Sequence, residues 1–101
     1  MAVISALGKF TTNAGTKVCL TSDASLYAYW VDIQALEANT NPVFIGSSTM
    51  NTTTLVGVLK VLSPGDSWSI PGGTGNTLHV ADLHLDVTTN GEGVYASCGI
   101  L

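Results

Sequence analysis

With 101 residues, a net charge of −4 and only 10% charged residues, the chain has the size of one domain and carries unusually few charges. Its three lysines, Lys9, Lys17 and Lys60, are scattered, whereas nucleic-acid binding needs clustered cations that displace counterions from several phosphates. No stretch reaches the roughly 18 apolar residues of a membrane helix. We therefore expect neither nucleic acid nor a membrane as a partner.

The first segment, residues 1–14, is predicted to form an N-terminal arm or an edge strand in front of a domain that spans residues 15–101. Its first residues lack the basic start of a signal peptide, so we expect the chain to fold in the cytoplasm where it is made. Val3, Ile4 and Leu7 are candidates for adding a strand to a neighbouring chain. Because few charges keep copies apart, we predict a component of a larger assembly.

Turn-forming residues recur at short intervals, and segments rich in Val, Ile, Leu, Tyr and Thr lie between them. This spacing is typical of an all-β sandwich or barrel with antiparallel strands. The turns are expected at residues 13–15, 39–42, 63–66, 71–77 and 90–93.

The segment 26–37 is ambiguous, because its apolar residues suit both a strand and a helix. Its aromatic and β-branched content favours the strand. Trp30, with Tyr27 or Tyr29 beside it, suits stacking on a sugar ring, as in a carbohydrate-binding module. The interpretation that we favour makes Trp30 and Trp68 core residues or anchors of a subunit contact.

The centre of the chain reads as strand, loop and strand. Val43 to Ile45 form the first strand, Gly46 stands where a side chain would obstruct the turn, and residues 47–54 are predicted to form a polar contact loop. The second strand covers Val56 to Val61, with a bulge near Gly57. The candidate contact residues of the loop are Ser47, Ser48, Thr49, Met50 and Asn51.

The clearest alternation lies near the end of the chain. Leu83, Leu85 and Val87 are expected on one face of a strand, with His84 and Asp86 on the other. A second apolar alternation begins at residue 94 and continues to residue 100. With the turn at residues 90–93 between them, the two strands are predicted to pair as a hairpin.

Few residues suggest chemistry. His79, Asp82, His84 and Asp86 form the one group to consider for a metal, but only His84 and Asp86 share a strand face, so a solvated face is the favoured interpretation. The nucleophile motif G-x-S-x-G is absent, and the loop at residues 71–77 lacks the Gly-Lys-Ser/Thr ending of a phosphate loop. We therefore predict no enzyme, no cofactor and no metal.

The two cysteines, Cys19 and Cys98, lie far apart in the sequence and are able to pair in principle. Disulfides are rare in a reducing cytosol, so two buried thiols are the favoured alternative.

Six short motifs occur in an order that resembles the small structural proteins of tailed bacteriophages, the capsid decoration (cement) and head-fibre-type proteins. The resemblance covers roughly residues 15 to 98. The motifs are GTKVCL at 15–20, WVDIQA at 30–35, NPVFIGS at 41–47, LSPGDS at 62–67, LHLD at 83–86 and GEGVY at 91–95.

This resemblance implies a β-sandwich of jelly-roll-like type without enzymatic activity. Such proteins often form trimers on the outer surface of an icosahedral head, where they bridge copies of the major capsid protein and resist the pressure of packaged DNA. The location would be the capsid surface of the virion. A tail or fibre component, or a small carbohydrate-binding module, remains the alternative. The chain departs from the family in the loop at residues 71–77 and in residues 1–10.

Overall fold

The computed structural model describes residues 3–72 and 75–100. Within them, the chain forms ten β-strands and one short 3-10 helix, joined by turns and loops. The prediction of an antiparallel all-β domain is confirmed, and no α-helix occurs among these residues. Residues 1–2 of the predicted arm, 73–74 of the predicted loop and 101 at the end lie outside the described residues. The elements are β1 Val3–Thr12, β2 Val18–Cys19, β3 Tyr27–Ala28, β4 Trp30–Ala35, β5 Val43–Gly46, β6 Val58–Leu62, β7 Ser67–Pro71, β8 Leu78–His79, η1 Val80–Asp82, β9 His84–Val87 and β10 Glu92–Ile100.

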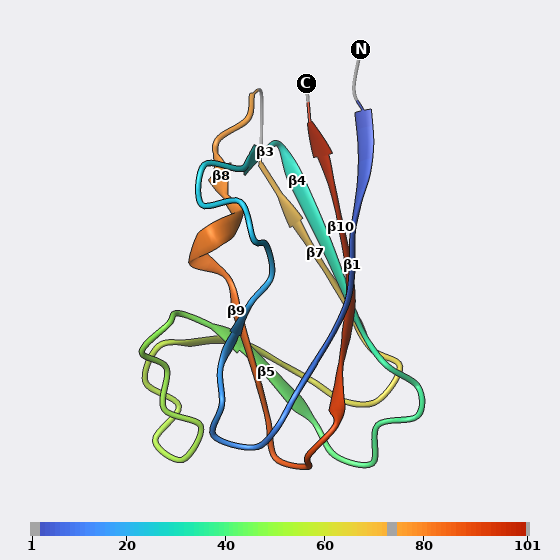
Figure 1. Cartoon of the computed structure of the whole chain (residues 1–101), viewed down its shortest axis with the longest axis vertical. Helices are drawn as coiled ribbons and strands as arrows, with labels where there is room; N and C mark the ends of the chain where they lie inside the picture. Colours follow the sequence, from blue (N-terminus) through green and yellow to red (C-terminus); the bar gives the residue numbers. More distant parts are fainter. Residues whose placement is uncertain (1–2, 73–74, 101) are drawn as a thin grey trace.

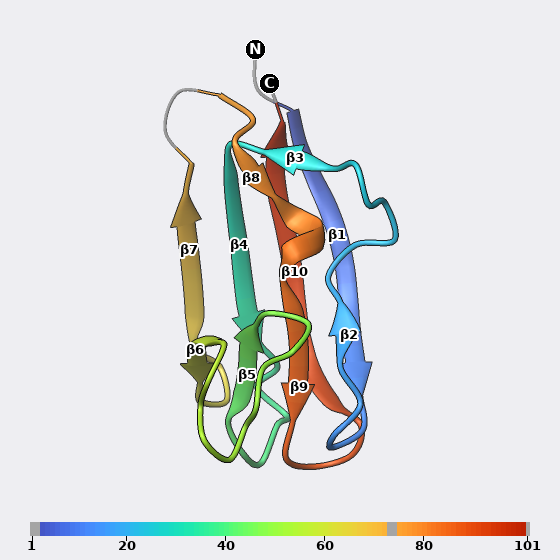
Figure 2. The ribbon, with the colours of Figure 1, turned by 90° about the vertical axis from the view of Figure 1, so that its left-hand side faces the viewer.

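The strands form two antiparallel four-stranded sheets and a small ribbon (Figures 1 and 2). Sheet A has the order β1-β10-β4-β7, sheet B has the order β2-β9-β5-β6, and β3 pairs with β8. The pairings are nested: β1 pairs with β10, β2 with β9, β3 with β8, β4 with β7 and β5 with β6. The chain therefore runs like one long hairpin whose tip is the β5–β6 connection.

The core lies between the two sheets and follows from the alternation of side chains along each strand. In β4, Val31, Ile33 and Ala35 are buried, while the residues between them are exposed. Sheet B contributes Val43 and Ile45 from β5, and similar residues from β9 complete the core. Most of residues 26–37 are strand, in β3 and β4, as their β-branched and aromatic content predicts.

The N-terminal segment is an edge strand of sheet A. Its β1 strand pairs with β10 from Val3 to Thr12, with one irregularity between Ala6 and Gly8. Leu7 and Phe10 are half-buried against the core. Val3 and Ile4, in contrast, are exposed.

The predicted hairpin near the end of the chain is wrong. Strand β9 pairs with β2 and β5 in sheet B, whereas β10 pairs with β1 and β4 in sheet A. The turn after β9 carries the chain from one sheet to the other, because burying both apolar alternations requires them to face each other across the core.

Side-chain hydrogen bonds tie the β4–β5 loop to the start of β10. The amide of Asn39 donates to the Gly93 carbonyl (2.8 Å) and accepts from the Gly93 N–H (3.1 Å). The buried Glu92 carboxylate accepts from the N–H and hydroxyl of Thr40 and from the Asn41 N–H. Burial alone raises the pKa of Glu92, but these hydrogen bonds outweigh it and hold the pKa below its ordinary value.

Candidate functional site

The β5–β6 connection, residues 47–57, is an ordered loop built around one buried side chain. Met50 is 2% exposed and lies beneath the backbone of Gly46 and Gly57. A Cβ at Gly46 would be 2.9 Å from the Met50 sulfur, and Gly57 has a positive φ of 77°. Both glycines are therefore required for the loop to close over Met50.

Hydrogen bonds within this loop fix the conformation of its far end. The Asn51 N–H donates to the Val56 carbonyl (2.8 Å), and the Leu55 N–H donates to the Asn51 carbonyl (2.7 Å). The Asn51 side chain also accepts from the N–H groups of Thr53 (2.8 Å) and Thr54 (3.0 Å). The loop is thus held by its own backbone and by one asparagine.

The end of this loop presents two apolar side chains to solvent. Leu55 is 52% exposed and Val56 is 69% exposed; we call this pair the apolar tip. Leu55 has a φ of 65°, which makes it the one non-glycine residue with positive φ in the described part of the chain. Such backbone is costly for a leucine and persists only where the surroundings enforce it.

One of the predicted contact residues of the loop, Met50, is not available for contact. Ser48, Thr49 and Asn51 are exposed and Ser47 is half-buried, but Met50 lies inside the loop and offers no outer surface. Leu55 and Val56 were missed, because the sequence reads them as the start of the next strand. Strand β6 begins only at Val58.

The edge strand β6 extends the apolar surface away from the tip. Leu59 and Val61 are exposed, and the pairing with β5 shifts between Ile45 and Gly46, so β6 bulges as predicted. Since β6 is the last strand of sheet B, one side of its backbone pairs with no strand in the described part of the chain.

A groove of about 490 Å³ opens between the inner face of β7 and the segment of β8 and η1, with one residue of β6 at its border. Trp68 and Ile70 of β7 and Leu59 of β6 contribute apolar walls. Thr77, His79 and Asp82 contribute polar groups. Trp68 is therefore half-buried on the inner face of sheet A and packs against the core.

Trp30 lies on the opposite, outer face of sheet A. A Cβ on Gly99, its register partner in β10, would overlap the indole ring. Tyr29 meets Trp30 edge-on, with ring centroids 6.2 Å apart. Tyr27 lies elsewhere and stacks on His79 at 4.7 Å. The three aromatic residues that the sequence placed together are thus divided between two sites.

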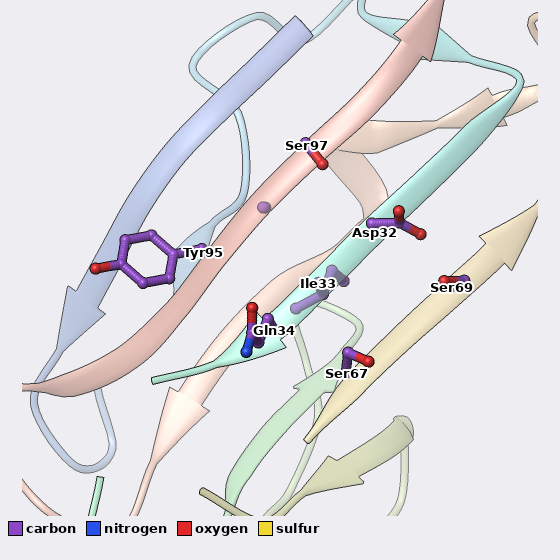
Figure 3. Close-up of a pocket in the computed structure, with 8 residues that line it drawn as sticks. Asp32, Ile33, Gln34, Ser67, Ser69, Tyr95 and Ser97 are labelled. Atoms are coloured by element: carbon purple, nitrogen blue, oxygen red, sulfur yellow. The ribbon is translucent and has the colours of Figure 1, made fainter. Parts of the chain in front are cut away.

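Polar side chains line a hollow of about 300 Å³ on the same outer face (Figure 3). They come from the three neighbouring strands β10, β4 and β7. The sequence alone does not reveal this hollow, although the alternation along β4 places Asp32 and Gln34 opposite the core residues. The polar lining residues are Asp32, Gln34, Ser67, Ser69, Tyr95 and Ser97.

The histidine and aspartate group does not converge on one point. His79 Nδ1 is 3.1 Å from the Asp82 carboxylate, and its Nε2 is 2.7 Å from the Ala24 carbonyl. The Ala24 carbonyl, helped by the Asp82 charge, raises the pKa of His79 despite partial burial. His84 reaches only the Asp82 carbonyl, at 3.4 Å. No group of three possible metal ligands is found among the described residues.

The prediction that Asp86 lies on a solvated strand face is wrong, because Asp86 is buried. Its carboxylate is 2% exposed and accepts from the N–H groups of Gly15 (3.1 Å) and Val87 (2.8 Å). The β1–β2 turn therefore covers this side chain, and Asp86 holds the turn in place.

The two cysteines are both free thiols. Cys98 is fully buried in the core, and burial raises the pKa of its thiol. Cys19 is half-buried rather than buried, and its thiol donates to the Ala81 carbonyl at 3.4 Å.

Comparison of the sequence with family models gives no match, and neither the search of curated proteins nor that of solved structures finds a significant one. Among the described residues, no helix has the length and apolar character needed to cross a membrane.

Proposed function

We propose that the chain is a non-enzymatic structural protein of a tailed-phage virion, which decorates the outer capsid surface and bridges copies of the major capsid protein. The observation that carries this proposal is the apolar tip. Leu55 and Val56 expose apolar surface on a loop whose backbone is strained at Leu55. Neither feature stabilises the isolated chain, whereas both are explained by a partner that covers the tip.

The loop is suited to docking because it is already ordered. Its hydrogen bonds and the buried Met50 fix the tip before contact, so little conformational entropy remains to be lost on binding. The outer edge of neighbouring β6 pairs with no strand of residues 3–72 and 75–100, and it exposes Leu59 and Val61. A strand of the capsid protein is able to pair there by β-augmentation.

The topology supports the same proposal. Eight strands in two four-stranded sheets, with nested antiparallel pairing from the ends of the chain inward, agree with a jelly-roll-like β-sandwich. Capsid proteins are among the proteins that use this architecture. The six sequence motifs that resemble decoration proteins supply the specific assignment to the capsid surface, and the host cytoplasm would be the place of synthesis.

We further propose that three copies associate, as the resemblance implies. Several weak contacts held by one trimer would combine into firm attachment without any single strong interface. Light scattering over a dilution series measures this directly. A mass of three chains that survives dilution is expected, and a monomer at all concentrations would contradict the trimer while leaving the capsid contact to its own test.

The capsid contact is tested by co-sedimentation with capsids assembled from the major capsid protein of the same genome without this chain. Leu55→Asp and Val56→Asp are expected to reduce the bound fraction strongly, because each buries a charge in the interface. Thr88→Asp, an exposed charge on the β9–β10 turn, is the matched control and should bind as the parent chain does. Undiminished binding of both tip variants, with their fold intact, would refute the proposed contact.

A further inference from the structure

The outer face of sheet A carries a trough that continues on both sides of Tyr95. The hollow of about 300 Å³ shares Gln34 and Tyr95 with a second hollow of about 400 Å³. The first extends toward Asp32 and the serines of β7 (Figure 3). The second extends toward Lys9 and Glu37. Together they form an elongated site rather than a pit for one small molecule.

Strand register places the lining residues in two rows across the sheet. Tyr95, Gln34 and Ser67 form one row, because Tyr95 pairs with Gln34 and Gln34 pairs with Ser67. Ser97, Asp32 and Ser69 form the next row in the same way. Neighbours lie about 4.8 Å apart across the strands, and the rows are separated by about 7 Å along them. Hydrogen-bonding groups therefore recur over the floor of the trough.

These side chains have unused hydrogen-bonding capacity. Within the described part of the chain, no side-chain hydrogen bond is formed by Asp32, Gln34 or the three serines of the trough. Elsewhere, carboxylates are engaged: Asp86 accepts from the backbone of Gly15, and Asp66 accepts from the Ser63 N–H. The acceptors and donors of the trough are exposed or half-buried, so they are available to a ligand.

We propose that this trough binds an uncharged oligosaccharide. The Tyr95 ring is 52% exposed and offers an apolar face on which a sugar ring can stack. The Asp32 carboxylate accepts from neighbouring sugar hydroxyls, and the Gln34 amide both donates and accepts. The first hollow contains a single charged side chain, Asp32, so a neutral ligand matches it best.

Trp30 supplies a second aromatic surface on the same face of the sheet, beyond the row of Ser97, Asp32 and Ser69 and outside the residues that line the two hollows. It precedes Asp32 by two residues on the same face of β4, about 7 Å away along the strand, and its indole lies on Gly99. Tyr95 and Trp30 are too far apart for one sugar ring to touch both. A chain of several sugars is therefore the expected ligand, and a monosaccharide is not.

The test titrates the folded, full-length chain with cellohexaose, maltohexaose and chitohexaose, each at millimolar concentrations, and follows backbone amide shifts by NMR. At least one is expected to shift the residues of β4, β7 and β10 that line the trough. Tyr95→Ala should weaken its binding by at least about tenfold, which corresponds to about 1.4 kcal/mol. Tyr27→Ala is the matched control, because Tyr27 is 47% exposed but belongs to β3.

Asp32→Asn keeps the shape of the trough and removes the charged acceptor, so it should also weaken binding while leaving the fold unchanged. Absence of shifts in the trough with all three hexasaccharides, or equal loss of affinity in Tyr27→Ala and Tyr95→Ala, would overturn the proposal. This inference does not rest on the capsid contact. Tyr95→Ala should still co-sediment with capsids, while the apolar-tip variants should retain sugar binding.

Discussion

The indole of Trp30 lies directly on Gly99, its register partner in the neighbouring strand β10. A methyl group at Gly99 would overlap the indole nitrogen and the carbon atoms beside it. Glycine at this position thus allows a large aromatic ring to lie flat on the outer face of the sheet, instead of standing upright from it.

Gly99→Ala is therefore expected to lower the free energy of unfolding by about 1–3 kcal/mol, the usual cost of an overpacked site. It should also change the fluorescence of Trp30, because the ring must move. Denaturant unfolding followed by fluorescence measures both effects. Gly75→Ala is the control, since nothing lies within 4 Å of a Cβ there; similar losses in the two variants would contradict the packing of Trp30 on Gly99.

Leu55→Asn should stabilise the isolated chain by up to about 1 kcal/mol, because asparagine tolerates positive φ better than leucine does. The same substitution should weaken capsid attachment, since it removes half of the apolar tip. Urea unfolding and co-sedimentation measure the two effects. Val56→Asn, at a position without positive φ, should weaken attachment without the gain in stability, and a less stable Leu55→Asn chain would argue against strain at this residue.

Glu92 should contribute to stability in a pH-dependent way. Its pKa is lower in the folded chain than its ordinary value, so its contribution is present above the unfolded pKa and is lost as the pH falls through the folded pKa. Glu92→Gln should therefore destabilise the chain at neutral pH, and the difference from the parent should shrink in acid. Unfolding in urea over a pH series measures this, with the exposed Glu37→Gln as control; a difference that is constant with pH would contradict it.

His79 should titrate above the ordinary histidine pKa, because the Ala24 carbonyl and Asp82 favour its protonated form. Its contribution to stability is complete below the unfolded pKa and is lost as the pH rises through the folded pKa. NMR titration of the imidazole measures the pKa. Asp82→Asn should lower it only in part, because the Ala24 carbonyl is the larger cause; a full return to the ordinary value would assign the effect to Asp82 instead.

The β4 strand was predictable because its pattern is local. Alternation at Val31 and Ile33 fixes which side chains face the core, and the β-branched content selects strand over helix. The bulge in β6 and the turns around Asn39 and Gly91 were predictable in the same way, because glycine or other turn-forming residues occur at those positions. None of these features requires knowledge of a distant segment.

The apolar alternations of β9 and β10 show the limit of such reasoning. A period of two reveals that a strand has a buried face, but it does not identify the neighbouring strand. The turn at residues 90–93 suggested a hairpin, whereas the two strands belong to different sheets.

Composition and short-range periodicity are sufficient to predict the all-β class, the positions of most strands and turns, and a surface with few charges. They do not predict that Met50 and Asp86 are buried, that Trp30 and Trp68 occupy opposite faces of one sheet, or that Tyr95 lies beside Gln34. These relationships depend on pairings between residues far apart in the chain. The contact between Asp86 and Gly15, for example, joins residues 71 positions apart, and no local pattern encodes it.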